Sequence, residues 1–189
     1  MGRANYVYDK RYIATLNMRT DGSSKVGKNN RWGFFPSISV AWAINEEKFM
    51  QNKSLFDELK VRVSYGLSGN QDAIDSYTSL QLVKPNGLVP VDGSPTVTLS
   101  TIRNANPDLK WEVKHTFNAG LDMALLNNRF FFKADYYYTK TKDMLYTYAV
   151  SVPPFAYNSL LANLGSMRNS GLELSLVFLP LRIKRWNLI

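Results

Sequence analysis

The chain has no cysteine and only one histidine among its 189 residues. Without cysteine there is no disulfide framework and no thiolate metal site, and a single histidine argues against a multi-histidine metal centre. No apolar run reaches the ~18 residues that a membrane-spanning helix needs. The first twelve residues, MGRANYVYDKRY, lack the apolar core of a signal peptide. If the protein is secreted or lies in an outer membrane, we therefore expect the chain to be a piece of a longer precursor.

Positive charge is in excess but is not concentrated in one stretch. The formal net charge is +8, and nucleic-acid binding requires clustered lysine and arginine side chains. Here the basic residues are spread along the chain and alternate with acids, as in Lys110, Glu112 and Lys114. A polar strand face of mixed sign accounts for this pattern, so no nucleic-acid partner is predicted.

Two loops imitate ligand-binding motifs without completing them. Residues 22–29, GSSKVGKN, follow the phosphate-binding pattern GxxxxGK[ST] until Asn29, which lacks the hydroxyl group that binds Mg²⁺. The aspartates Asp72, Asp75, Asp92 and Asp108 miss the spacing of an EF-hand calcium loop. No nucleophile stands at a recognisable spacing from a base. The sequence therefore predicts neither enzyme activity nor a cofactor.

Alternation of apolar and polar residues is the dominant pattern. Ile38, Val40, Trp42 and Ile44 alternate with small residues, which places their side chains on one face of a pleated strand. The same period recurs in six segments, and it predicts an all-β, antiparallel sheet with one apolar and one polar face. The segments are residues 10–19, 32–44, 59–68, 109–123, 130–142 and 160–179.

The fourth segment alternates over about fifteen residues, longer than the ~5–6 residues usual in globular sheets. It places Leu109, Trp111 and His115 on the apolar face, where we expect no ligand role for the histidine. The acids of the polar face, including Asp122 and Asp135, are expected to pair with basic neighbours.

The connections between these segments differ in length at the two ends of the predicted sheet. A short helical turn within residues 45–58 and a tight turn at Asn127 and Asn128 lie at one end. The longer stretches 20–31, 69–108 and 141–159 lie at the other. Long loops at one end are typical of outer-membrane β-barrels, where they are extracellular. Four prolines among Val, Leu and Thr predict that residues 69–108 form a folded excursion.

The motifs RY-x-ATL, DGSS-x-x-GKNNRWGFFPS and SYG-x-SGNQ appear in this order. They are followed by NPDLKWE, NAGLDMALLNNR, DYYYTKTKDML and NSGLELSL. Over nearly the whole chain this series resembles the barrel of SusC/RagA-type TonB-dependent outer-membrane transporters. The resemblance implies a transmembrane barrel of about 22 strands, of which residues 1–189 supply six to seven. It also implies that the plug domain, the TonB-contacting segment and the C-terminal closing strand are absent from this chain.

For function, the resemblance implies import of glycans or peptides across the outer membrane of a Gram-negative, Bacteroidetes-like bacterium. The expected partners are outer-membrane lipid, a SusD-like surface lipoprotein, and TonB through the absent N-terminal region. Two alternatives stay open. One is a soluble all-β carbohydrate-binding domain, in which the same alternation packs two sheets, and the other is an outer-membrane porin without energy coupling.

Six residues are candidates for contact with the substrate. Asn70, Gln71 and Asp72 follow directly on a strand, at the predicted rim of the lumen, where they either hydrogen-bond a polar substrate or cap the strand end. Tyr77, Tyr146 and Tyr157 fall in predicted outer loops, where their rings either stack on sugars or pack the loops. We predict no catalytic and no metal-binding residue.

Overall fold

The computed structural model describes residues 1–50, 55–72 and 74–180. Within these residues the regular structure consists of nine β-strands and two short 3-10 helices, and no described helix is long and apolar enough to cross a membrane. The sequence after Pro180 also predicts that residues 182–189 begin a further element, and these residues lie outside the described ones.

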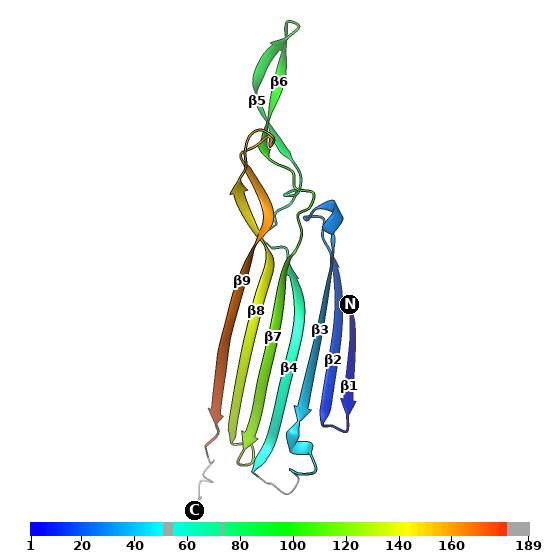
Figure 1. Cartoon of the computed structure of the whole chain (residues 1–189), viewed down its shortest axis with the longest axis vertical. Helices are drawn as coiled ribbons and strands as arrows, with labels where there is room; N and C mark the ends of the chain where they lie inside the picture. Colours follow the sequence, from blue (N-terminus) through cyan, green and yellow to red (C-terminus); the bar gives the residue numbers. More distant parts are fainter. Residues whose placement is uncertain (51–54, 73, 181–189) are drawn as a thin grey trace, which may run out of the picture.

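Seven strands form one antiparallel sheet in the order β1-β2-β3-β4-β7-β8-β9 (Figure 1). Two more, β5 (Leu82–Val91) and β6 (Ser94–Arg103), form a hairpin that projects beyond one end of this sheet. In the described part of the chain the sheet is open, because β1 and β9 each pair on one side only. The large sheet contains β1 (Gly2–Tyr8), β2 (Tyr12–Gly22), β3 (Trp32–Ala43), β4 (Phe56–Asn70), β7 (Glu112–Leu125), β8 (Phe130–Ala149) and β9 (Ser159–Phe178).

The predicted all-β, antiparallel class with six to seven strands is confirmed. The six predicted segments correspond to β2, β3, β4, β7, β8 and β9, and the seventh strand is β1. It pairs with β2 along its whole length, from Gly2 opposite Met18 to Tyr8 opposite Tyr12. The predicted helical turn after β3 is the 3-10 helix η2 (Ile44–Glu46).

The prediction of a long loop over residues 141–159 is wrong. Strand β8 continues to Ala149 and β9 begins at Ser159, so the loop is confined to residues 150–158. The pairing of the two strands shifts register on either side of Met144, next to Asp143 with its φ of 57°. This irregularity interrupts the two-residue period and conceals the strand in the sequence.

The apolar side chains of the large sheet are exposed on one side, and along β4 their exposure alternates with partial burial. On β4, Val63 and Tyr65 are 43% and 45% exposed, whereas Arg62 and Ser64 are partly buried. On β9, Leu172, Leu174 and Leu176 are each 64% exposed. A sheet in water normally covers its apolar side with a second layer, but nothing in the described residues covers this one. We call this side the apolar face and the opposite side the polar face.

The largest fully buried side chains, those of Ile74, Leu109 and Val26, lie at the end of the sheet that carries the long connections. Val26, Phe35, Ile74, Leu109 and Trp111 form one cluster, the rim cluster, and each is at most 7% exposed. The prediction that Leu109 and Trp111 stand on the apolar face is therefore wrong. Strand β7 begins only at Glu112, and the residues before it pack against the loop between β2 and β3.

One carboxylate organises the opposite end of the sheet. Glu47 accepts hydrogen bonds from the Tyr12 hydroxyl at 2.7 Å, Trp42 Nε1 at 3.0 Å and Arg11 Nη1 at 2.9 Å. Chiefly the hydrogen bonds from Tyr12 and Trp42 lower the pKa of Glu47 below its ordinary value, with a further contribution from Arg11. The carboxylate thus ties the β1–β2 turn to the connection that follows β3.

The packing of the β2–β3 loop predicts a strong effect at Gly27. Its N–H donates to the Leu109 carbonyl at 2.7 Å, and a Cβ at this position would overlap the backbone carbonyl of Pro107. Overpacking of this kind costs about 1–3 kcal/mol. We expect Gly27→Ala to detach the loop and speed its cleavage by trypsin in the full-length protein. Gly2→Ala is the matched control, because its Cβ meets nothing within 4 Å; equal cleavage of both variants would contradict this packing.

Candidate functional site

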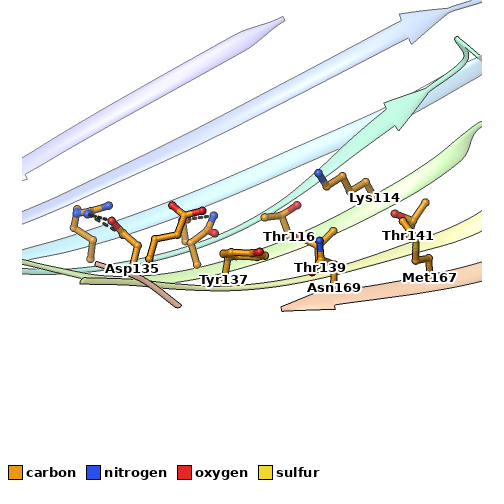
Figure 2. Close-up of a pocket in the computed structure, with 12 residues that line it drawn as sticks. Lys114, Thr116, Asp135, Tyr137, Thr139, Thr141, Met167 and Asn169 are labelled. Atoms are coloured by element: carbon orange, nitrogen blue, oxygen red, sulfur yellow. Dashed lines mark hydrogen bonds and ion pairs between the residues drawn. The ribbon is translucent and has the colours of Figure 1, made fainter. Parts of the chain in front are cut away.

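A hollow of about 480 Å³ opens on the polar face of the sheet. We call it the polar groove. Its lining side chains come from β4, β7, β8 and β9 and alternate with those of the apolar face, as the sequence pattern predicts. Figure 2 shows the following members of the lining: Lys114, Thr116, Asp135, Tyr137, Thr139, Thr141, Met167 and Asn169.

At one end of the polar groove the side chain of Arg62, on β4, contacts carboxylates on both β7 and β8. Its Nε and Nη2 donate to the two carboxylate oxygens of Asp122 at 2.7 and 3.0 Å, and Nη2 also donates to Asp135 Oδ1 at 2.9 Å. A planar guanidinium is suited to such forked contacts with carboxylates. These contacts confirm, for Asp122 and Asp135, the prediction that acids of the polar face pair with basic neighbours. The sequence alone did not identify Arg62 as the partner.

A glycine makes this arrangement possible. Gly120 on β7 lies directly opposite Arg62 on β4 and Asp135 on β8. A Cβ at Gly120 would meet Asp135 Oδ1 and would lie 2.8 Å from Arg62 Nη2. The guanidinium therefore reaches across β7 only because that strand has no side chain at this point.

The chemistry of the polar groove is that of a hydrogen-bonding surface. Hydroxyl, amide and phenol groups line it. Of its charged side chains, Arg62 and Asp135 pair with each other, and Lys114 and Glu173 are the other two. In the residues that the structure describes, no three metal-ligating side chains converge. The groove suits the passage or transient binding of a polar solute.

Asn70, Gln71 and Asp72 lie together at the rim, as predicted. They share a small hollow with Arg19, Asp21 and Trp111. Asn70 accepts the Asp72 N–H at 3.0 Å and donates to Glu112 at 3.0 Å, which are the contacts of a strand-end cap. The Oε1 of Gln71 is buried and has no hydrogen-bond partner in the described part of the chain. Contact of these three residues with a substrate stays a prediction.

The three candidate tyrosines lie on different segments. Tyr77 precedes β5 and is 69% exposed, Tyr146 lies on β8 and is 66% exposed, and Tyr157 lies in the β8–β9 loop and is 38% exposed. Tyr77 lines a hollow with two lysines of the β2–β3 loop, Lys25 and Lys28. Whether any of these rings stacks on a substrate stays a prediction.

Sequence reasoning missed the residue that fastens the root of the β5–β6 hairpin. The buried Asn104 donates from Nδ2 to the carbonyls of Tyr157 and Ser159 at 2.6 and 2.9 Å. Its Oδ1 accepts the N–H groups of Ala156 and Tyr157 at 3.2 and 3.1 Å. Nearby, Asn106 donates to the Leu161 carbonyl at 2.8 Å. The only signal in the sequence is the asparagine-rich segment RNANPD, which does not reveal its partners.

Comparison with known proteins agrees with this geometry. The family model described as "TonB dependent receptor-like, beta-barrel" matches residues 1–189. TonB-dependent receptor P26 of Formosa agariphila is 44% identical over 98% of the chain and 18% of its own length. TonB-dependent receptor SusC of Bacteroides thetaiotaomicron is 37% identical over 99% of the chain and 19% of its own length.

A solved structure, that of the RagAB peptide importer in the "open-open" state, superposes with a TM-score of 0.84 at 35% identity. The match covers 92% of this chain and 18% of that one. The chain spans about a fifth of the length of the relatives it matches. With a family model matched along its whole length, the chain belongs to the TonB-dependent receptor-like β-barrel family.

Proposed function

We propose that this chain forms part of the wall of an outer-membrane β-barrel that imports large nutrients by TonB-dependent transport. In this role the apolar face contacts lipid and the polar groove faces the lumen. The chain has no catalytic role. The strands cross the outer membrane of a Gram-negative bacterium, with the long connections and the β5–β6 hairpin outside the cell.

The observation that carries this proposal is the height of the apolar face. It begins at the row of Leu125, Phe130 and Phe178, which are neighbours on β7, β8 and β9. It ends at the row of Tyr65, Phe117 and Tyr138 on β4, β7 and β8. The eight residue steps from Phe130 to Tyr138 span about 27 Å along the strand at ~3.4 Å per residue, which is about 19–22 Å of height at the ~35–45° tilt of membrane-barrel strands. Membrane barrels have apolar bands about 25 Å tall between aromatic girdles.

The exposed apolar face also weighs against a soluble carbohydrate-binding domain. A soluble sandwich would bury the leucines of β9 against a second sheet, yet these are among the most exposed apolar side chains of the described residues. A porin without energy coupling would have a similar wall. The family match favours the TonB-dependent transporter over the porin.

The relatives support the choice of partners and substrate class. SusC and the RagAB peptide importer favour import of glycans or peptides together with a SusD-like lipoprotein at the outer mouth. The energy would come through TonB, which would contact a part of the protein outside this chain. Asn70, Gln71 and Asp72 are placed to contact a substrate at the rim, and Tyr77, Tyr146 and Tyr157 to do so in the outer segments.

Energy coupling is tested by uptake in living cells. We expect cells that carry the full-length gene to accumulate a labelled glycan or peptide of their growth substrate, and to lose this uptake when TonB is deleted. Cells that lack only this receptor provide the background. Receptor-dependent uptake that persists without TonB would show a porin instead.

The assignment of the two faces is tested by two adjacent substitutions. An arginine facing lipid near the middle of a membrane barrel costs about 2–4 kcal/mol, whereas lumenal substitutions cost much less. In the full-length protein we expect Val63→Arg to lower the yield of folded barrel far more than Ser64→Arg, as measured by heat-modifiable mobility on gels. Equal yields, or the reverse order, would contradict the assignment.

The role of the hairpin is tested by a deletion that spares its root. Lys84 lies opposite Ser100, so residues 85–99 can be replaced by an Asn-Gly turn. A larger deletion of residues 71–107 would also remove Ile74 and Asn104, which hold the rim together. We expect the short deletion to preserve barrel assembly and to weaken nutrient uptake or lipoprotein association about tenfold, close to 1.4 kcal/mol.

The control for this deletion is Thr96→Ala, which keeps the hairpin and its exposed apolar residues. It should leave assembly, uptake and association unchanged. Normal uptake and normal lipoprotein association in the assembled deletion variant would show that the hairpin has no part in either step.

A further inference from the structure

On β7, β8 and β9 the apolar face changes character abruptly on the long-connection side of the row of Tyr65, Phe117 and Tyr138. The next residues on that face are His115 on β7, Lys140 on β8 and Arg168 on β9, which lie directly opposite one another in the register of the three strands. Lys142 follows two residues beyond Lys140 on the same strand. We call Lys140, Lys142 and Arg168 the outer basic row.

These side chains share the face of the aromatic row. Tyr138, Lys140 and Lys142 are separated by two residues each, and in a strand such residues project to the same side. The hydroxyl group of Tyr65 lies 2.7 Å from Nδ1 of His115, which confirms that the histidine stands on this face. Lys114, one residue before His115, lines the polar groove on the opposite face.

The charges of the outer basic row are not compensated by nearby acids. In the described part of the chain none of the three cations takes part in an ion pair, and the adjacent Asp143 is paired with Lys110 at 2.8 Å. Lys140 and Arg168 are direct cross-strand neighbours, and like charges in this position destabilise a sheet. An anion between the side chains would relieve this repulsion.

We infer that the outer basic row binds the phosphate groups of a lipid headgroup in the outer leaflet of the membrane. Arginine matches phosphate oxygens with a forked pair of donors, and lysine supplies a point charge. A lipid whose phosphates lie at Lys140 and Arg168 would extend its acyl chains along the exposed Tyr136, Leu172 and Leu174 just below. The cations thus match the phosphates of an anionic lipid, and the apolar side chains match its acyl chains.

Position decides between a lipid and other anions. The outer basic row faces away from the polar groove, so an anionic nutrient in the lumen does not reach it. It is continuous with the apolar band and lies at the end that carries the long connections. This inference rests on the proposed membrane location, although its own test measures lipid binding and not uptake.

The test measures binding of lipid A to the full-length protein in an uncharged detergent, by native mass spectrometry. The variant is Lys140→Gln/Lys142→Gln/Arg168→Gln. The control is Lys25→Gln/Lys28→Gln/Arg31→Gln, which removes the same charges from the β2–β3 loop at the same end of the molecule. Heat-modifiable mobility shows that each protein is assembled. We expect the variant to bind lipid A about tenfold or more weakly, and the control to bind it normally.

Two further probes identify the source of the phosphate. Dephosphorylated lipid A should bind the unchanged protein as weakly as lipid A binds the variant, and inorganic phosphate at the same concentration should not displace lipid A. If the triple variant does not assemble, Lys140→Gln alone should weaken binding about fivefold.

Four results would overturn the site: equal binding by the variant and the unchanged protein, an equal loss in the control, equal binding of the dephosphorylated lipid, or displacement by inorganic phosphate. A protein that imports its nutrient through TonB but shows any of these results would refute the lipid site and leave the proposed function intact.

Discussion

The alignment of neighbouring strands is the constraint on which the rest of this structure depends. A slip of one residue between two strands would exchange the apolar and polar faces of everything beyond it. Contacts on the polar face oppose such a slip at more than one position along the strands. Arg62 reaches both Asp122 and Asp135 across Gly120, and nearer the rim Glu112 accepts hydrogen bonds from Asn70 on β4 and Leu145 on β8. The ion pairs of the polar face thus also maintain the apolar face.

Periodicity predicted the strands wherever one side of the chain is consistently apolar, as in β3, β4, β7 and β9. It failed where local geometry overrides the pattern. The register shift around Met144 concealed the last part of β8, residues 143–149. In the β5–β6 hairpin, Pro90 and Pro95 face each other in register. Proline normally argues against a strand, but a two-stranded hairpin has free outer edges where the missing N–H groups cost nothing.

From the sequence, a residue of the candidate site could be assigned only to a strand face or a strand end, and its long-range contacts could not be predicted. The sequence placed Asn70, Gln71 and Asp72 together because they are consecutive after a strand. It did not bring Asn104 to the β8–β9 loop, which lies about fifty residues away along the chain, because asparagine contacts with backbone carbonyls leave no periodic trace. Leu109 and Trp111 were misassigned for a related reason. Their apolar character suits burial under a loop as well as exposure on a sheet, and only the tertiary arrangement distinguishes the two.

The anchoring of the β5–β6 hairpin has a mechanical consequence. Its two strands of ten residues make an arm about 34 Å long at ~3.4 Å per residue, and the arm stands beyond the end of the sheet (Figure 1). On one side its root continues into the rim cluster through Ile74, and on the other it is clamped to the β8–β9 loop by Asn104. A sideways force at the tip is therefore converted into torque on the β8–β9 loop and the rim cluster. Movement of the hairpin tip would therefore be felt first at the rim of the sheet, where the root is held.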